Sequence, residues 1–141
     1  MSKRSLLFGA LTLLALAGAA CSSGGGTAAA DVQRLTVLVG DSMSFEPAAL
    51  TVQRGRPVQL TVRNTGATEH DLVIPALPVT NVKGVETGGH SHGAGSAIVA
   101  HPKLKGEVTV SFTPTTAGVY DIACSMPGHS QLGMAGTLTV T

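Results

Sequence analysis

Residues 118–140 read GVYDIACSMPGHSQLGMAGTLTV, and this stretch decides the fold because it joins two strand patterns by a short loop. In its first part Tyr120, Ile122 and Cys124 alternate with smaller or polar residues, so they share one face of an extended chain. Residues 135–141, AGTLTVT, resume the same alternation. The stretch therefore predicts two strands, with Cys124 at the end of the first and on its core side.

The rest of the chain repeats this pattern from residue 34 onward. Clusters of Gly, Pro, Asn and Thr separate runs rich in Val, Thr, Ile and Leu, as turns separate the strands of a sandwich. No apolar stripe of helical period follows the first twenty residues. The sequence therefore predicts an all-β domain of two packed sheets, with further strands in residues 34–40, 49–55, 57–64, 70–76 and 107–115.

Residues 1–20 are expected to be a signal peptide, because Lys3 and Arg4 precede the apolar run LLFGALTLLALAGAA. That run is shorter than the roughly 20 apolar residues that a membrane helix needs. Its end, Ala-Gly-Ala-Ala-Cys, resembles a bacterial lipoprotein signal and predicts lipidation of Cys21. Ordinary cleavage that leaves Cys21 as a free thiol is the alternative.

Residues 21–32 are rich in Gly, Ser and Ala, which is typical of a flexible linker. Residues 33–141 are then long enough for one domain of ordinary size. Removing the signal leaves seven basic and eight acidic residues, a net charge of −1 with neutral histidines. A nearly neutral domain without a basic run gives no reason to expect nucleic-acid binding.

The loop 124–134 carries Cys124, His129 and Met134 in a Cys-x4-His-x4-Met arrangement. A thiolate, an imidazole and a thioether are soft donors that suit copper, and Cu(I) above all. His70, in TEHDLVI, adds the second imidazole of a trigonal His2Cys site with a weak axial Met, the arrangement of blue-copper electron carriers. These residues predict a protein that carries single electrons on one copper ion.

Other chemistries fit the same residues less well. Structural zinc takes four Cys or His ligands at paired spacing, and the folded domain has no second cysteine. A nucleophilic Cys124 with His129 as its base would leave Met134 unexplained, and no residue is evident to orient that base. We therefore do not expect an enzyme. A disulfide between Cys21 and Cys124 stays open as an alternative.

Two further interpretations remain open. His90, His92 and His101 lie in the long stretch 75–101, which we expect to be irregular, and they are either auxiliary metal contacts or solvated loop residues. Together with Met43 and Met126, these histidines also allow a copper storage or delivery protein that does not carry electrons. A cell-surface β-sandwich that binds no metal is a third possibility.

The chain from Leu35 to Thr141 resembles the cupredoxins, the small blue-copper proteins. The resemblance rests on MSFEPAALTVQRGRPVQLTVRNTGATEHDLVI, which begins at Met43, and on GVYDIACSMPGHSQLGMAGTLTV. The Cys-x4-His-x4-Met spacing is similar to that of auracyanin, rusticyanin and sulfocyanin, and a tethered, exported protein of the auracyanin or halocyanin kind is the nearest match.

The resemblance implies a Greek-key β-sandwich with one type 1 copper, cycling between Cu(I) and Cu(II), near one end. The ligands implied are His70, Cys124, His129 and Met134. It also implies a monomer with weak, transient redox partners, located at the outer face of the cytoplasmic membrane or in the periplasm. The apolar residues beside His129 would then belong to a partner-docking patch, or else only shape the loop: Met126, Pro127 and Leu132.

The chain departs from the family immediately after the first histidine. Many cupredoxins carry Asn at this position, where Asp71 stands here, and Ser125 follows Cys124. A hydrogen bond between Asp71 and Ser125 would link the two ligand-bearing segments behind the metal. A solvent-facing Asp71 is the alternative.

Overall fold

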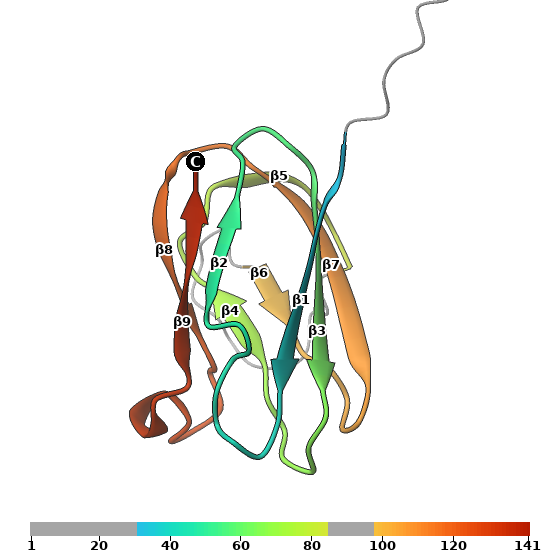
Figure 1. Ribbon diagram of the computed structural model, residues 1–141, viewed down its shortest axis with the longest axis vertical. Helices are drawn as coiled ribbons and strands as arrows, with labels where there is room; N and C mark the ends of the chain where they lie inside the picture. The colour runs from blue at the N-terminus through green and yellow to red at the C-terminus, as the bar shows by residue number, and fades with distance from the viewer. Residues whose placement is uncertain (1–30, 85–97) are drawn as a thin grey trace, which may run out of the picture.

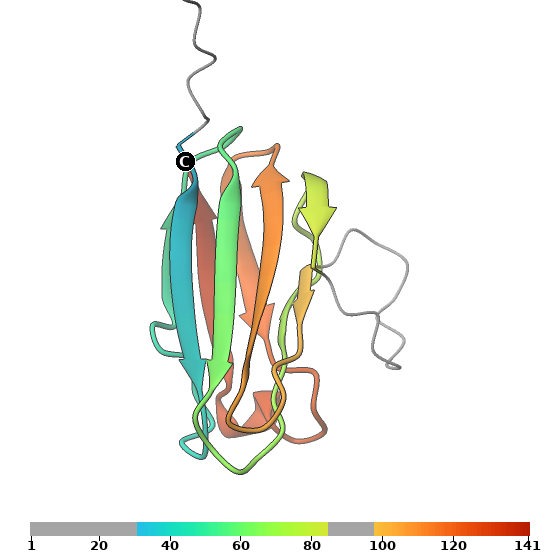
Figure 2. The ribbon, with the colours of Figure 1, turned by 90° about the vertical axis from the view of Figure 1, so that its right-hand side faces the viewer.

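The computed structural model describes residues 31–84 and 98–141, and in them two sheets pack face to face (Figures 1 and 2). One sheet has the order β1-β3-β7-β5, formed by β1 (Gln33–Val39), β3 (Val58–Asn64), β7 (Glu107–Pro114) and β5 (Val79–Lys83). The other has the order β2-β9-β8-β4-β6, formed by β2 (Ala49–Val52), β9 (Ala135–Val140), β8 (Gly118–Ala123), β4 (Leu72–Ile74) and β6 (Ile98–Ala100).

Strands that are distant in the sequence are neighbours in both sheets. β1 pairs with β3 and β2 pairs with β9, both in parallel, while β8 and β9 form an antiparallel hairpin. The predicted all-β, Greek-key sandwich is therefore confirmed.

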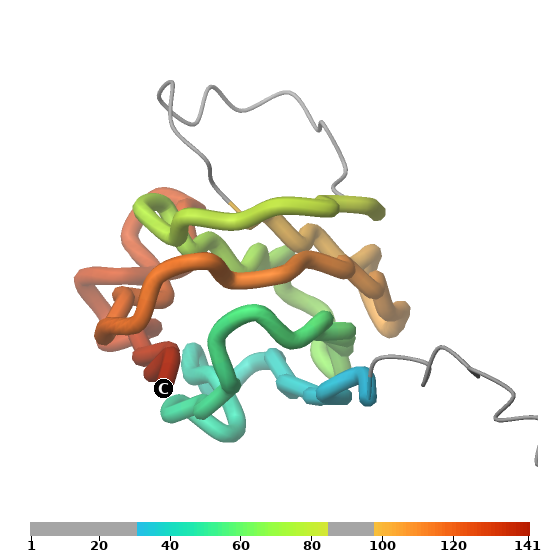
Figure 3. The backbone as a smooth tube through the Cα atoms, turned by 90° about the horizontal axis from the view of Figure 1, so that it is seen from above, coloured from blue at the N-terminus to red at the C-terminus, as the bar shows by residue number. Residues whose placement is uncertain are grey.

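The core lies between the two sheets and is filled by alternate residues of the strands. In β3, Val58, Leu60 and Val62 are fully or almost fully buried, whereas Gln59 and Thr61 between them are not. Viewed along the strands, the two layers enclose this core (Figure 3). Burial of the apolar faces is the main force that closes the sandwich.

The stretch 75–101 is more ordered than the sequence analysis predicted, and that prediction is wrong for its two ends. β5 adds to the edge of one sheet through β7, and β6 adds to the edge of the other through β4. β6 has only three residues, all buried, so it shows no alternation that could identify it as a strand. β5 follows Pro78 and pairs irregularly with β7, which hides its pattern as well.

Three predictions concern residues outside the described part of the chain. They are the signal in residues 1–20, lipidation of Cys21, and the histidines His90 and His92. Within the residues that the structure describes, no helix has the length and apolar character that crossing a membrane requires.

The two ends of the sandwich differ. β1 and β3 both run toward one end, which we name the ligand end: the turns after these strands and the loop 124–134 meet there (Figure 1). At the opposite end, named the terminal end, Asp31 forms an ion pair with Arg56, and Thr141 accepts a hydrogen bond from the N–H of Arg54.

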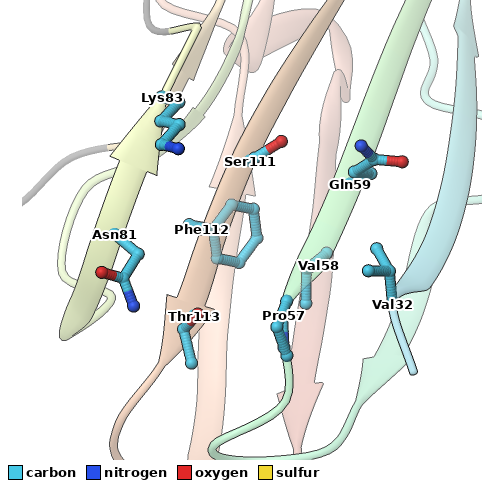
Figure 4. A pocket seen from close by; sticks show the side chains of 9 residues that line it. All are labelled: Val32, Pro57, Val58, Gln59, Asn81, Lys83, Ser111, Phe112 and Thr113. Carbon is cyan, nitrogen blue, oxygen red and sulfur yellow. The ribbon is translucent and has the colours of Figure 1, made fainter. Parts of the chain in front are cut away.

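A shallow hollow of about 320 Å³ lies over the sheet of β1, β3, β7 and β5, near the beginning of β3 (Figure 4). Gln59, Ser111 and Lys83 line it in one row across three strands. The row belongs to the polar outer face of the sheet. The hollow is therefore separate from the ligand end of the domain.

Candidate metal centre

Cys124 stands directly after β8, where the sheet fixes its backbone. Its side chain is 1% exposed, on the core side as the alternation of β8 predicted. Its N–H donates to the carbonyl of Met134 (3.4 Å), and its carbonyl accepts a hydrogen bond from the hydroxyl of Ser130 (2.7 Å). The backbone that carries the thiol is therefore fixed before any metal binds.

A tight turn brings the remaining loop donors back toward Cys124. His129 precedes a short 3₁₀ helix, η1 (Ser130–Leu132), which ends at Gly133 with φ of 96°. This left-handed conformation is favourable for glycine and strained for most other residues. The N–H of Met134 then donates to the carbonyl of His129 (3.1 Å), and the Met134 side chain is fully buried.

His70 reaches the same place from the other segment, two residues before β4. It is fully buried, and neither ring nitrogen has a hydrogen-bond partner in the described part of the chain. Buried polar groups are nearly always paired, so an unpartnered buried imidazole requires an explanation. A metal ion is a direct one, since neutral imidazole is a common metal ligand.

The donor atoms of His70, Cys124 and His129 all lie within 4.8 Å of one another. The Sγ of Cys124 is 3.4 Å from Nδ1 of His129, and the two imidazole rings are 5.0 Å apart between centroids, tilted by 54°. Bonds of about 2.0–2.3 Å, as in zinc sites, separate two ligands at 120° by about 3.5–3.9 Å. The Cys124–His129 pair has this spacing and the other pairs are no more than 4.8 Å apart, so small side-chain shifts bring the three donors around one ion. This donor set suits copper.

Burial controls the protonation of two of these donors. It lowers the pKa of His70, and the nearby His129 acts in the same direction, while the Gly40 backbone and the carboxylates of Asp41 and Asp71 oppose them. A lowered pKa keeps the imidazole neutral and ready to bind a metal.

The thiol of Cys124 behaves in the opposite way. Burial is the main cause that raises its pKa, because the thiolate loses its hydration. The metal-free protein therefore holds a neutral thiol, and metal binding must release that proton.

The expected hydrogen bond between Asp71 and Ser125 is present, and Asp71 is buried rather than solvent-facing. Its Oδ1 accepts from the N–H of Ser125 (2.6 Å), and its Oδ2 accepts from the Ser125 hydroxyl. Since Asp71 follows His70 and Ser125 follows Cys124, this pair links the two ligand-bearing segments directly behind the donors.

His101 lies apart from this group of donors. It is half-buried and lines a second hollow together with Glu69 and Leu104. Within the described residues, the three-residue metal-ligating group contains His70, Cys124 and His129 but not His101.

Sequence reasoning missed the residues that support the turn before His70. Asn64 and Asp41 hydrogen-bond this turn from its two sides. The signal for such a turn was present in the Asn-Thr-Gly and Gly-Asp steps, which are typical of turns. The pairing of the two turns was not visible, because they are more than twenty residues apart.

Fold and site together define a small β-sandwich protein with a buried mononuclear site of soft donors at one end. A family model described as copper binding proteins, plastocyanin/azurin family, matches residues 32–141. The chain belongs to this family, the cupredoxins. Copper is its metal, and His70, Cys124, His129 and Met134 are positioned as a type 1 copper site.

Individual relatives and solved structures agree with this assignment. The chain is 31% identical to the copper-resistant cuproprotein CopI of Rubrivivax gelatinosus, over 82% of this chain and 70% of the relative. It is 29% identical to auracyanin-A of Chloroflexus aurantiacus, over 97% of this chain and 96% of the relative.

The structure of auracyanin A, a "blue" copper protein from Chloroflexus aurantiacus, superposes with a TM-score of 0.59 at 26% identity, over 78% of this chain and 99% of the other. The auracyanin of Roseiflexus castenholzii superposes with a TM-score of 0.60 at 23% identity, over 77% of this chain and 97% of the other, a likeness of fold.

Proposed function

We propose that this chain is a type 1 blue-copper electron carrier, not an enzyme, that shuttles single electrons between redox partners outside the cytoplasmic membrane. The observation that carries this proposal is the preformed donor set: the donor atoms of His70, Cys124 and His129 lie within 4.8 Å of one another, and His70 and Cys124 are buried. Electron transfer is fast when the ligands move little between the two oxidation states, and a preformed set meets this requirement.

Each donor has a separate role in this proposal. Cys124 would supply the thiolate after losing its proton, His70 and His129 the two imidazoles, and Met134 the weak axial thioether. Bound copper supplies a one-electron Cu(II)/Cu(I) couple. Asp71 and Ser125 would keep the two ligand-bearing segments at a fixed separation during that change.

Redox partners would dock at the ligand end, beside His129. This histidine is half-buried, whereas Leu132 on the following turn is 68% exposed. Met126 and Pro127 extend the apolar surface. A small, weakly binding interface of this kind suits brief redox encounters between a monomeric carrier and its partners.

We further propose that the chain is exported and held at the outer face of the membrane by a lipid on Cys21. The basic start, apolar run and small residues before Cys21 support this proposal. Mass spectrometry of the mature protein tests it: a diacylglycerol-modified N-terminal Cys21 is expected, whereas an unmodified N-terminus elsewhere would refute the anchor.

Titration of Cu(II) into the purified protein tests the electron-carrier proposal. One copper bound with an intense thiolate-to-copper band, followed by reversible one-electron reduction in voltammetry, is the expected result. A colourless complex, or a bound ion that cannot be reduced and reoxidised, would refute it.

The relation to CopI favours copper handling as a second candidate function, since two of the relatives carry the name copper-resistant cuproprotein. A storage or delivery protein must release its ion to an acceptor. Transfer of copper to a competing Cu(I) chelator within minutes, together with copper sensitivity of a strain that lacks the protein, would favour this function over electron carriage.

A further inference from the structure

Asn64, the last residue of β3, hydrogen-bonds across the turn between β3 and β4 from the interior of the sandwich. Asn64 is 1% exposed. Its Nδ2 donates to the carbonyl of Thr68 (2.8 Å), and its Oδ1 accepts from the N–H of Gly66 (2.9 Å). The amide side chain thus spans the turn and fixes its shape.

Asp41, which belongs to the turn after β1, hydrogen-bonds the same turn from the solvent side. Its Oδ1 accepts hydrogen bonds from the N–H of Ala67 (3.0 Å) and from the hydroxyl of Thr68 (3.0 Å). These donors lower the pKa of Asp41, with the Ala67 N–H as the largest cause. Asp41 therefore carries its negative charge at neutral pH.

Two glycines allow the two turns to touch. A Cβ on Gly66 would lie 2.6 Å from Oδ1 of Asp41 and 2.8 Å from its backbone nitrogen, and one on Gly40 would lie 2.9 Å from Oγ1 of Thr65. The N–H of Thr65 also donates to the carbonyl of Val39 (2.9 Å). The turns after β1 and β3 therefore form one packed unit, seen together at the ligand end in Figure 2.

This unit directly precedes His70, which follows Thr68 by two residues. The His70 ring nitrogens have no hydrogen-bond partner in the described chain, although the Gly40 backbone next to Asp41 acts on the pKa of the ring. The position of the ring therefore depends on the backbone that carries it and on packing, including that of the turn after β1. Whatever fixes the turn therefore fixes the imidazole. Asp41 also acts on His70 through its charge, which opposes the effect of burial on the pKa of His70.

We propose that Asp41 is a positioning residue of the metal centre: its carboxylate holds the turn 64–68 where it delivers His70, and its negative charge stabilises the more positive, oxidised state of the centre. The first half concerns the metal-free protein. The second half rests on the proposed redox function, and the two halves are measured separately.

Hydrogen exchange of the metal-free protein tests the positioning role, by NMR of the Ala67 amide. Asp41→Ala removes the acceptor, so exchange at Ala67 should be faster by between about twofold and tenfold, the range that one hydrogen bond supports. Asp41→Asn keeps an acceptor oxygen and should restore most of the protection. Asp31→Asn, which removes one charge at the terminal end, is the matched control.

Two results would overturn the positioning role. One is wild-type protection of Ala67 in Asp41→Ala. The other is a loss of protection in Asp31→Asn equal to that in Asp41→Ala, which would point to a general effect of charge. If Asp41→Ala does not fold, Asp41→Thr, which retains a shorter acceptor, replaces it with the same expectation of faster exchange.

The reduction potential of the copper-loaded protein tests the charge. Asp41→Asn should shift the potential in the positive direction relative to both the wild type and Asp31→Asn. An unchanged potential would overturn this half of the proposal. If the wild-type protein shows no reversible couple, the electron-carrier function fails instead, and the exchange measurement still decides the positioning role.

Discussion

Replacing Ser125 by alanine removes the hydroxyl that donates to the carboxylate of Asp71 and leaves the Ser125 N–H as its neighbouring donor (2.6 Å). Asp71 is 1% exposed, but Ser125 itself is exposed, so water can replace part of the lost donor. A hydrogen bond to a charged group contributes about 1.5–3 kcal/mol, and an unsatisfied buried acceptor costs a similar amount. Because water offsets part of this penalty, we expect Ser125→Ala to lower the free energy of unfolding of the metal-free protein by about 1–2 kcal/mol.

This loss translates into a measurable change in melting temperature. A domain of about 110 residues has an unfolding entropy of about 0.23 kcal/mol/K, at roughly 2.1 cal/mol/K per residue. The expected decrease in Tm is then about 4–9 °C. Urea unfolding should show a lower midpoint at an unchanged slope, which indicates a change in stability rather than in denatured-state compactness.

Matched variants make the result specific. Ser125→Thr keeps the hydroxyl and should restore most of the stability. Ser111→Ala, on the outer face of β7, should change the free energy of unfolding by no more than about 0.5 kcal/mol. A loss below about 0.5 kcal/mol for Ser125→Ala itself would refute the argument that the Asp71 carboxylate depends on this hydroxyl.

Three further predictions concern the metal centre. Cys124→Ser should abolish the thiolate-to-copper absorption band while leaving the strand content in circular dichroism unchanged; a retained band would show that another group supplies the thiolate. Asp71→Asn removes a negative charge next to His70 and should raise the reduction potential by some tens of millivolts. For one electron, about 59 mV corresponds to about 1.4 kcal/mol. An unchanged potential at neutral pH would count against an effect of the Asp71 charge on the copper. Because burial lowers the pKa of His70 below its ordinary value of 6.5, the unfolded chain binds more protons below that pH. The metal-free protein should therefore lose stability as the pH falls from 6.5 toward the folded-state pKa of His70, by up to about 1.4 kcal/mol per pH unit. His70→Gln should remove this pH-dependent loss of stability. Identical pH profiles of stability for the wild type and His70→Gln would contradict the attribution to His70.

The sequence predicted the strands that are half-exposed, because they alternate between core and solvent. β3 and β8 are examples, and the alternation of β8 also placed Cys124 correctly on the core side. β4 and β6 each have three residues, all buried, so neither shows a period. β4 was still predicted because it lies in the apolar run 70–76, whereas β6 follows a stretch rich in Gly and His that was expected to be irregular. β5 was missed because it pairs irregularly at the edge of its sheet.

The loop donors were predictable because they are close together in the sequence and chemically distinctive. His70 was predictable only in combination with them, since a lone histidine in a strand pattern has many possible roles. The contribution of Asp41 could not be predicted, because it depends on two turns that are in contact only after β1 and β3 pair in parallel. Local pattern thus identified the donors, while tertiary pairing determined what holds them in place.

The separation between the ligand end and the terminal end has a practical consequence for attaching the protein to surfaces. β1 begins and Thr141 ends at the terminal end, where Asp31 is paired with Arg56 (Figure 1). A tag or thiol linker at either end of the folded domain would therefore orient an immobilised layer with the ligand end facing the solution. For the proposed electron carrier, such a layer should exchange electrons with dissolved partners more readily than with the electrode. A linker placed near Leu132 should reverse that preference.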